Sequence, residues 1–154
     1  MKLETMNVGV VGAGAWGTAL ADQLAKIGHK VTLWAYENEV AEAIRETRIN
    51  SIYLPQHQLH PAIEPTTDLG KTVHDKQMVV VAVPSHHVRH IAEQFRSELG
   101  RGTFLVSATK GIETDSLMTM SEIYSDVLES NFHKYFAVLS GPSFAIEAAK
   151  GMPT

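Results

Sequence analysis

The stretch NVGVVGAGAWG, residues 7–17, decides the fold that we expect for this chain of 154 residues. Its first part, NVGVV, is short, apolar and β-branched, which is typical of a strand buried on both faces. The glycines Gly12, Gly14 and Gly17 follow in the spacing GxGxxG. Apolar side chains then recur at helical spacing, at Trp16, Leu20, Leu24 and Ile27. The segment predicts a strand, a tight turn and a helix in immediate succession.

The three glycines have distinct uses if this turn binds a dinucleotide. Gly12 permits the sharp turn, Gly14 lets the backbone approach a pyrophosphate, and Gly17 allows the helix to pack closely on the strand. The pyrophosphate then lies at the N-terminus of the helix, where free N–H groups and the helix dipole favour an anion. The alternative is a glycine-rich turn that holds no ligand. The flanking strand and helix favour the dinucleotide interpretation.

The rest of the chain continues this alternation. Further strands are expected over residues 30–35, 78–83, 103–108 and 136–139. Helices are expected over residues 39–48, 68–74, 88–99 and 117–127, with another starting near Phe144. Residues 49–65 hold three prolines and are expected to form a loop with a short strand near 62–64. This order predicts one α/β domain over residues 1–154, a Rossmann-type, doubly wound, mostly parallel sheet with helices on both faces.

The end of the second expected strand carries the residues that we expect to discriminate between NAD and NADP. Glu37 lies about 20 residues beyond the glycine turn, where an acid commonly accepts a hydrogen bond from the ribose 2′-OH of NAD. Residues 35–44 contain no Arg or Lys that would neutralise a 2′-phosphate. The sequence favours NAD over NADP, although Glu37 also fits an exposed acid in the first turn of a helix. Tyr36 is expected to flank the adenine or to cover the strand end.

Three more motifs follow expected strands, where ligands of open α/β sheets bind. They are VPSH (residues 83–86), TKGIE (109–113) and SGPSFA (140–145), and together they are expected to ring one crevice. Lys110 is the candidate for a direct role in substrate binding or in the reaction, because a cation there can bind a substrate phosphate or hydroxyl and polarise a developing alkoxide. The alternative is an ordinary loop lysine. The turn at residues 140–143 offers N–H groups and hydroxyls to an anion, or is a plain turn in which Ser143 caps a helix.

The composition excludes several other classes of site. The chain has no cysteine, which removes disulfides, thiolate catalysis and thiolate-bound metals. Its formal charge is −4, and its 13 Lys and Arg residues form no cluster, which argues against a nucleic-acid or anionic membrane partner. The longest apolar run, residues 78–84, is far short of the roughly 18 residues of a membrane helix. His86 and His90 have the spacing of a metal-binding pair, but no third ligand is evident, so no metal site is expected.

Four motifs in order resemble one known family over the whole chain. The segments are GAGAWGTALA (residues 12–21), VPSH (83–86), TKGIE (109–113) and SGPSFAIEAAKGMPT (140–154). They are similar to those of the NAD(P)-dependent sn-glycerol-3-phosphate dehydrogenases, in the bacterial form. The resemblance implies an oxidoreductase that reversibly transfers hydride between NAD(P)H and dihydroxyacetone phosphate. The product, sn-glycerol 3-phosphate, supplies glycerophospholipid synthesis, and a cytoplasmic location is expected.

The resemblance also implies roles for individual residues. Cofactor contacts are expected, beyond the glycine turn and Glu37, from Ala15, Trp16, Tyr36, Lys110 and Ala145. Substrate contacts are expected from Lys110, Gly141 and Ser143. His87 departs from the family pattern, since family members often place a Phe there beside the nicotinamide. The departure puts that single contact in doubt and not the family.

The resemblance further implies a second, mostly helical domain that carries the proton-acceptor lysine. No position of this sequence matches that lysine, so no catalytic residue is expected in this chain, which should bind dinucleotide and be nearly inactive alone. A small phosphorylated substrate is the expected partner, and a homodimer is compatible with the full-length enzyme. Two alternatives stay open: a dinucleotide-binding module without catalysis, and a related β-hydroxyacid or ketopantoate-type reductase.

Overall fold

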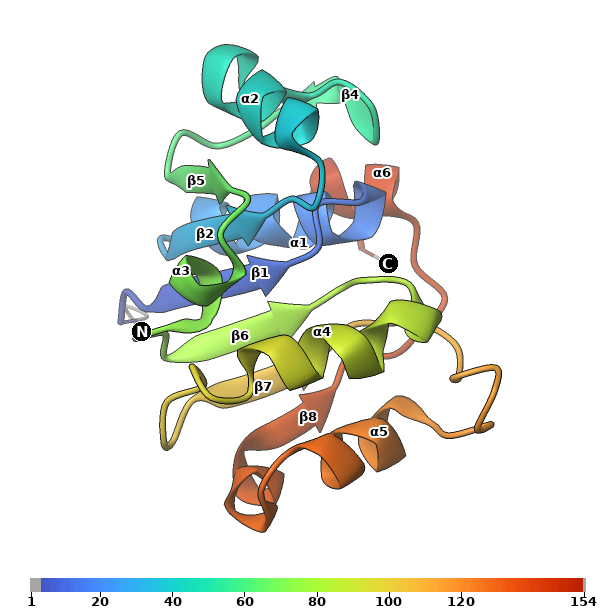
Figure 1. Ribbon diagram of the computed structural model, residues 1–154. Helices are drawn as coiled ribbons and strands as arrows, with labels where there is room; N and C mark the ends of the chain where they lie inside the picture. The colour runs from blue at the N-terminus through green and yellow to red at the C-terminus, as the bar shows by residue number, and fades with distance from the viewer. Residues whose placement is uncertain (1–3, 154) are drawn as a thin grey trace.

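The computed structural model describes residues 4–153, which form a six-stranded parallel sheet with helices on both faces (Figure 1). The strand order is β5-β2-β1-β6-β7-β8. The strands are β1 (Asn7–Val11), β2 (Lys30–Trp34), β5 (Ile63–Thr66), β6 (Met78–Val81), β7 (Phe104–Ser107) and β8 (Phe136–Val138). The α-helices are α1 (Ala15–Lys26), α2 (Asn38–Thr47), α3 (Leu69–Val73), α4 (Val88–Phe95), α5 (Met120–Val127) and α6 (Ala145–Ala149). The predicted fold class, a doubly wound Rossmann-type sheet, is confirmed.

The two faces of the sheet bury separate hydrophobic clusters. One cluster joins α3, α4 and α5 to the sheet, and the other joins α1 and α2 to its opposite face. Strand β1 serves both, because Val10 packs into the second cluster while the next residue, Val11, packs into the first. All three of its valines are fully buried, as expected for a strand covered on both faces. This burial explains why the apolar pattern of β1 is nearly continuous rather than alternating.

The stretch expected to be a loop contains a small hairpin that the sequence did not reveal. Strands β3 (Ile49–Asn50) and β4 (Leu54–Gln58) pair antiparallel, separate from the main sheet. The short strand expected near 62–64 is present as β5 and extends to Thr66. Its Pro65 is tolerated because β5 is an edge strand, where a missing N–H costs no ladder hydrogen bond on the open side.

Three details of the expected helices are wrong. Ile27 lies outside α1 and is 55% exposed, because the buried face of α1 is made of small residues such as Gly17 and Ala21. Leu117 was expected in a helix but lies outside α5 with φ of 60°. Helix α5 begins later because Thr119 and Glu122 form a capping box. Helix α4 ends at Phe95 and not at residue 99 as the sequence predicts.

The described residues also contain two short 3₁₀ helices, η1 (Ser85–His87) and η2 (Ser130–Tyr135).

Candidate functional site

A pocket of about 550 Å³ lies at the carboxyl ends of β1, β2 and β6. Strand β1 has β2 on one side and β6 on the other, so the chain reverses its direction of travel across the sheet at this point. Open α/β sheets bind their ligands at such a switch point. The glycine turn, the end of β2 and one side of α4 line the pocket. The topology therefore places the GxGxxG motif where a ligand is expected.

Two of the three glycines are required by the protein itself. Gly12 has φ of +114°, and a Cβ there would lie 2.6 Å from the Ala82 carbonyl oxygen. A Cβ on Gly17 would lie 1.9 Å from the Gly12 carbonyl oxygen, because α1 packs directly on the turn. Neither position can accept a side chain without a shift of the backbone.

Gly14 is different, because nothing in the protein requires a glycine there. Its φ is −66°, which any residue adopts, and a Cβ would meet no atom within 4 Å. Gly14 also lines the pocket. The open space beside Gly14 is the space that a ligand approaching the backbone would need.

The first turn of α1 presents backbone amides to this space. Gly14 is the N-cap, and the first intrahelical bond runs from Thr18 N to Gly14 O at 2.9 Å. The amides of Ala15 and Trp16 precede that bond, so they belong to the orphan donors of a helix N-terminus. Free amides and the positive end of the helix dipole suit a pyrophosphate.

Asn50 holds the turn in place and was missed by the sequence reasoning. Its side chain is fully buried, and Nδ2 donates to Ala13 O at 2.8 Å and to Thr18 Oγ1 at 2.9 Å. Its Oδ1 accepts from Tyr53 N at 3.1 Å within the β3–β4 hairpin, so Asn50 joins the hairpin to the turn through its two Nδ2 bonds. An Asn in an expected loop is an ordinary turn residue. No local signal in the sequence marked its partners, which lie 32 and 37 residues away.

Glu37 and Tyr53 form the rim of the pocket near the end of β2. The Tyr53 hydroxyl donates to Glu37 Oε1 at 2.8 Å, and both residues line the pocket. The Glu37 carboxylate raises the pKa of Tyr53, because it accepts a hydrogen bond from the protonated hydroxyl and its negative charge disfavours a phenolate. Tyr36 is 81% exposed, with its ring edge-on to Trp34. The sequence predicted Tyr36 and Glu37 at this place but not Tyr53, which arrives on the hairpin.

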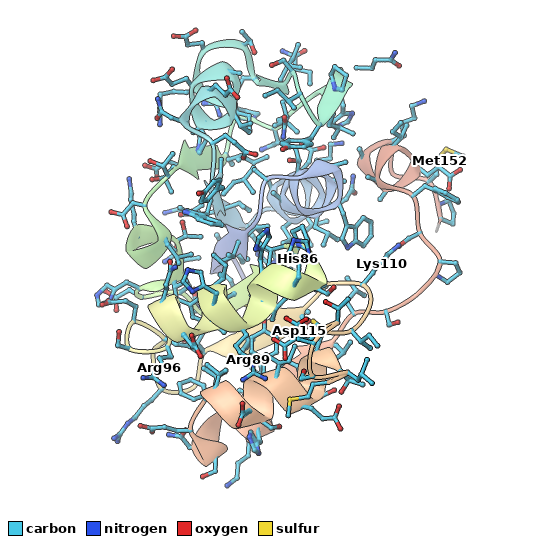
Figure 2. All side chains as sticks on the ribbon, turned by 45° about the vertical axis from the view of Figure 1, so that its right-hand side comes forward. His86, Arg89, Arg96, Lys110, Asp115 and Met152 are labelled. Atoms are coloured by element: carbon cyan, nitrogen blue, oxygen red, sulfur yellow. The ribbon has the colours of Figure 1, made fainter. Side chains whose placement is uncertain are left out.

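The loops after β7 and β8 meet around Lys110. Its Nζ donates to Ser143 O at 2.9 Å and lies 5.4 Å from the centroid of the Trp16 ring (Figure 2). Trp16 in turn donates from Nε1 to Ala108 O at 3.2 Å. Lys110 and Gly141 line a second hollow of about 500 Å³ between these two loops. The structure thus brings together Trp16, Lys110 and the turn at residues 140–143, as the motif positions predicted.

The VPSH turn lies beside the Lys110 loop. Thr109 Oγ1 donates to Val83 O at 2.9 Å, and a Cβ on Gly111 would lie 3.6 Å from Ser85 Oγ. Gly111 itself has φ of +97°, a backbone conformation that favours glycine. Because β7 lies between β6 and β8, TKGIE is the middle of the three motifs at this edge of the sheet. VPSH lines the larger pocket with Val83 and Pro84, whereas TKGIE and the turn after β8 line the second hollow, so the expected single crevice consists of two adjoining hollows.

Two smaller expectations concern the start of α6. The N-cap of α6 is Phe144 and not Ser143, so the capping role considered for Ser143 is wrong. Ala145 is the first residue of α6 and packs, like Trp16, against a small cluster between α1 and α6. Of the two, Ser143 lies beside Lys110, whose Nζ donates to its carbonyl oxygen.

The histidines near α4 make other contacts. The rings of His86 and His87 lie 4.0 Å apart, and His90 Nε2 lies 2.7 Å from Gln94 Nε2. His87 and His90 line the larger pocket. Residues 4–153 contain no group of three His, Asp or Glu side chains that could hold a metal ion.

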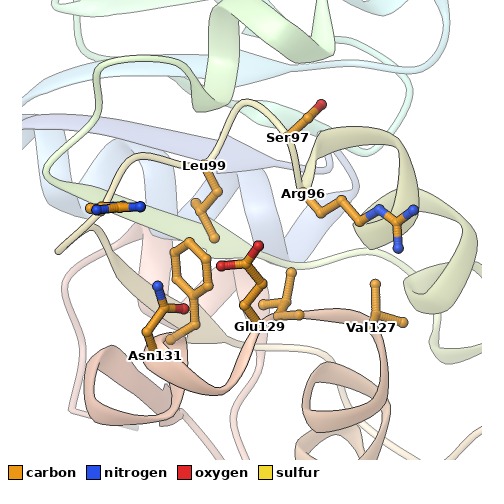
Figure 3. Close-up of a pocket in the computed structure, with 9 residues that line it drawn as sticks. Arg96, Ser97, Leu99, Val127, Glu129 and Asn131 are labelled. Atoms are coloured by element: carbon orange, nitrogen blue, oxygen red, sulfur yellow. The ribbon is translucent and has the colours of Figure 1, made fainter.

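A further hollow of about 390 Å³ lies away from the site, between the loop after α4 and η2 (Figure 3). Arg96, Leu99 and Glu129 are among the residues that line it. It lies at the amino-terminal edge of the strands and contains no residue of the four motifs. In the described part of the chain, no helix is long and apolar enough to cross a bilayer.

Comparisons with known proteins identify the family of this chain. Residues 7–154 match the family model described as NAD-dependent glycerol-3-phosphate dehydrogenase N-terminus. The chain is 48% identical to the glycerol-3-phosphate dehydrogenase (NAD(P)+) of Syntrophotalea carbinolica, over 97% of this chain and 45% of that protein. It is 47% identical to that of Geobacter sulfurreducens, over 96% of this chain and 44% of the relative. The chain therefore spans less than half the length of these relatives.

Solved structures give the same result. The crystal structure of glycerol-3-phosphate dehydrogenase from Coxiella burnetii superposes with a TM-score of 0.87 at 29% identity, covering 97% of this chain and 45% of that one. A ketopantoate reductase from Ralstonia eutropha superposes with a TM-score of 0.63 at 22% identity, over 86% of this chain and 40% of that one, and shares the fold alone. This chain belongs to the family of NAD-dependent glycerol-3-phosphate dehydrogenases, whose N-terminal part it matches.

Proposed function

We propose that residues 1–154 are the dinucleotide-binding domain of a glycerol-3-phosphate dehydrogenase that uses NAD or NADP. The whole enzyme would reversibly reduce dihydroxyacetone phosphate to sn-glycerol 3-phosphate. One observation supports the proposal most strongly: Gly14 faces open space at a helix N-terminus, although the protein needs no glycine there. That space suits the pyrophosphate of a dinucleotide.

The first turn of α1 and the larger pocket beside it would hold different parts of the dinucleotide. The amides of Ala15 and Trp16 would hold the pyrophosphate, and Tyr36 would flank the adenine. Glu37, held by Tyr53 at 2.8 Å, would accept hydrogen bonds from the adenosine ribose. The dinucleotide, when bound, supplies the hydride donor or acceptor.

The same rim supports a preference for NAD over NADP. The residues that line the pocket, all within the described part of the chain, include neither Lys nor Arg. The Glu37 carboxylate would repel a 2′-phosphate placed beside it. We therefore expect Glu37→Gln to narrow the difference between the affinities for NADH and NADPH, which fluorescence titration with both measures.

The Lys110 end of the crevice would take the phosphorylated substrate. The ammonium group of Lys110, the turn at Gly141 and the hydroxyl of Ser143 offer a cation and hydrogen-bond donors to an anion. Lys110 Nζ also lies 5.4 Å from the centroid of the Trp16 ring. Trp16 belongs to the first turn of α1, where the cofactor would bind, so Lys110 would contact both cofactor and substrate. Ala145, at the start of α6, would complete the cofactor contacts on this side.

The chemical step needs one more group. When hydride leaves the alcohol carbon, a base must take the hydroxyl proton. The family resemblance places that base, a lysine, in the helical second half of the relatives, which no position of this chain matches. We therefore propose that this domain alone binds NADH but turns over little substrate. The same proposal extends to the whole enzyme. It would be a homodimer in the cytoplasm, and it would supply glycerol 3-phosphate for lipid synthesis.

The direct test is NADH oxidation with dihydroxyacetone phosphate. This chain should bind NADH yet show turnover far below the typical enzyme kcat of about 10 s⁻¹, whereas a longer chain with the second half should approach that rate. Turnover near 10 s⁻¹ by the 154-residue chain would contradict the role given to the second half. A preference of the longer chain for a non-phosphorylated keto acid would favour a ketopantoate-type reductase, a fold that this chain shares.

A further inference from the structure

One ion pair joins α4 to the loop that carries Lys110. Arg89, in the first turn of α4, donates from Nε to Glu113 Oε1 and from Nη2 to Oε2, each at 3.0 Å. The Glu113 side chain is 12% exposed and that of Arg89 is 28% exposed. A contact through two parallel hydrogen bonds fixes orientation as well as distance. The pair therefore determines how the loop after β7 lies against α4.

Glu113 is also the centre of the loop's own hydrogen bonds. Its N–H donates to Met118 O and its carbonyl accepts from Leu117 N, both at 2.9 Å. The Ser116 hydroxyl donates to the same carboxylate that receives Arg89. The hydrogen bonds from Arg89 and Ser116 hold the pKa of Glu113 below its ordinary value, so the carboxylate is ionised at neutral pH.

The same guanidinium reaches a third element. Arg89 Nη1 donates to Asp126 of α5, and Nη2 lies 3.2 Å from Met118 Sδ. Figure 2 shows Arg89 between α4 and α5. We call Arg89, Glu113 and Asp126 the Arg89 brace. It links two helices and the loop between β7 and α5, which contains no helix and only a single isolated β-bridge within the described residues.

The loop's other end is at the site. Lys110 precedes Glu113 by three residues, and its Nζ bonds Ser143 O at 2.9 Å. Thr109 is anchored to Val83 O at 2.9 Å. Lys110 is thus held between an anchor at Thr109 and the brace at Glu113, and its ammonium lies on the exposed side of the crevice. A change at Glu113 would move Lys110 through a short span of chain.

We propose that Arg89 and Glu113 are positioning residues for Lys110. The brace holds the loop so that the ammonium group lies at the substrate end of the crevice. It thereby affects the affinity for the phosphorylated substrate more than the affinity for the dinucleotide, most of whose proposed contacts lie at the glycine turn and the end of β2. The inference rests on the proposed function, because it requires that Lys110 contacts that substrate.

The test compares Glu113→Ala, Glu113→Gln and the matched control Glu93→Gln in the enzyme that includes the second half found in relatives. Glu93 is exposed on the same helix as Arg89 and contributes nothing to the brace. Because misplacement of a positioning group by 1 Å can cost about 100-fold, we expect Glu113→Ala to raise the KM for dihydroxyacetone phosphate roughly 10-fold. The KM for NADH should stay within about 2-fold. Glu113→Gln keeps an acceptor for Arg89 and should give a smaller rise, while Glu93→Gln should give none.

An unchanged KM for dihydroxyacetone phosphate in Glu113→Ala, or equal losses for both substrates, would overturn the inference while the unmodified enzyme stays active. If the unmodified enzyme does not reduce dihydroxyacetone phosphate, the proposed function fails instead. In that case the labelling rate of Lys110 by an amine reagent, read by peptide mass spectrometry in the 154-residue chain, still tests the brace. The rate should rise several-fold in Glu113→Ala relative to Lys30, and an unchanged rate would contradict the brace.

Discussion

The two ends of the crevice are built in different ways. At the glycine turn, buried groups converge: Asn50 and Thr18 bond the Ala13 carbonyl, and α1 packs so closely that Gly17 has no room for a side chain. At the Lys110 end, residues 140–142 are exposed, Ser143 is half-buried, and the neighbouring Phe144 is 70% exposed. One end is enclosed by this chain, and the other is open.

The difference follows from what each end is proposed to hold. A turn that binds an anion through backbone amides works only if those amides are fixed beforehand, so its surroundings are buried and hydrogen-bonded. A substrate that must be enclosed by further groups needs a surface that stays open until they arrive. We therefore expect substitutions that disturb the packing or the anchor of the glycine turn, at Gly17 or Asn50, to lower both stability and NADH binding. Substitutions at Gly14 should lower NADH binding without a loss of stability, and those at the open end should affect substrate use more than NADH binding.

Gly17→Ala should produce the largest loss of stability. The new Cβ would lie 1.9 Å from the Gly12 carbonyl oxygen, so α1 and the turn must separate. We expect the free energy of unfolding, measured in urea, to fall by about 3 kcal/mol. Gly14→Ala is the matched control, since it meets no atom and should leave stability unchanged or raise it by up to about 1 kcal/mol. Similar losses in the two variants would show that the turn is not packed as described.

Asn50→Ala should cost somewhat less. The change removes two buried hydrogen bonds from Nδ2 and leaves the acceptors of the turn less satisfied. We expect the free energy of unfolding to fall by about 2–3 kcal/mol, and the NADH affinity to fall with it, because the turn loses its anchor. Asn50→Asp is the informative companion, since it keeps the acceptor for Tyr53 but not the donor. If Asn50→Ala keeps the NADH affinity of the unmodified chain, the hairpin does not hold the turn in the form that binds NADH.

Asp22 should give a smaller, pH-dependent effect. Burial raises the pKa of Asp22, but hydrogen bonds from Lys26, His57 and the His60 amide outweigh it and hold the pKa below 3.8. A carboxylate with a lowered folded pKa contributes stability that is present above about pH 4 and is lost as the pH falls through the folded pKa.

We therefore expect Asp22→Asn to lose about 2 kcal/mol at pH 7 and to show a flatter stability profile than the unmodified chain below pH 4. Urea unfolding at a series of pH values measures both quantities. Asp22 lies on α1, and its partner His57 lies on β4. Parallel stability profiles for the two proteins would show that the Asp22 carboxylate does not stabilise this contact between β4 and α1.

The strongest features of the sequence were local ones. Strand β1, the turn and α1 form one continuous segment, and β6 is an uninterrupted apolar run, so periodicity and glycine spacing sufficed to predict them. The motifs after β6, β7 and β8 were predicted to meet because parallel strands bring their carboxyl ends to one edge. Lys110 and Ser143 do lie together there.

The features that the sequence did not reveal depend on distant contacts. Asn50 and Tyr53 reach the site on a hairpin that contains Pro55 and has no clear alternation, and their partners lie 16 to 37 residues away. The exposure of Ile27 and the shorter α4 and α5 also depend on tertiary packing and capping. Arg89 showed no motif at all, because its role arises from folding Glu113 and Asp126 against it.

The most direct test of the glycine turn is a calorimetric titration of Gly14→Val with NADH, beside the unmodified chain. The Cβ of a valine at Gly14 would meet no atom within 4 Å, so we expect the fold to be kept and the unfolding midpoint in urea to stay close to that of the unmodified chain. Its side chain would occupy the space assigned to the pyrophosphate, and we expect the affinity for NADH to fall at least about 100-fold. An affinity equal to that of the unmodified chain would contradict the account, because the turn would then be a structural glycine turn that holds no dinucleotide.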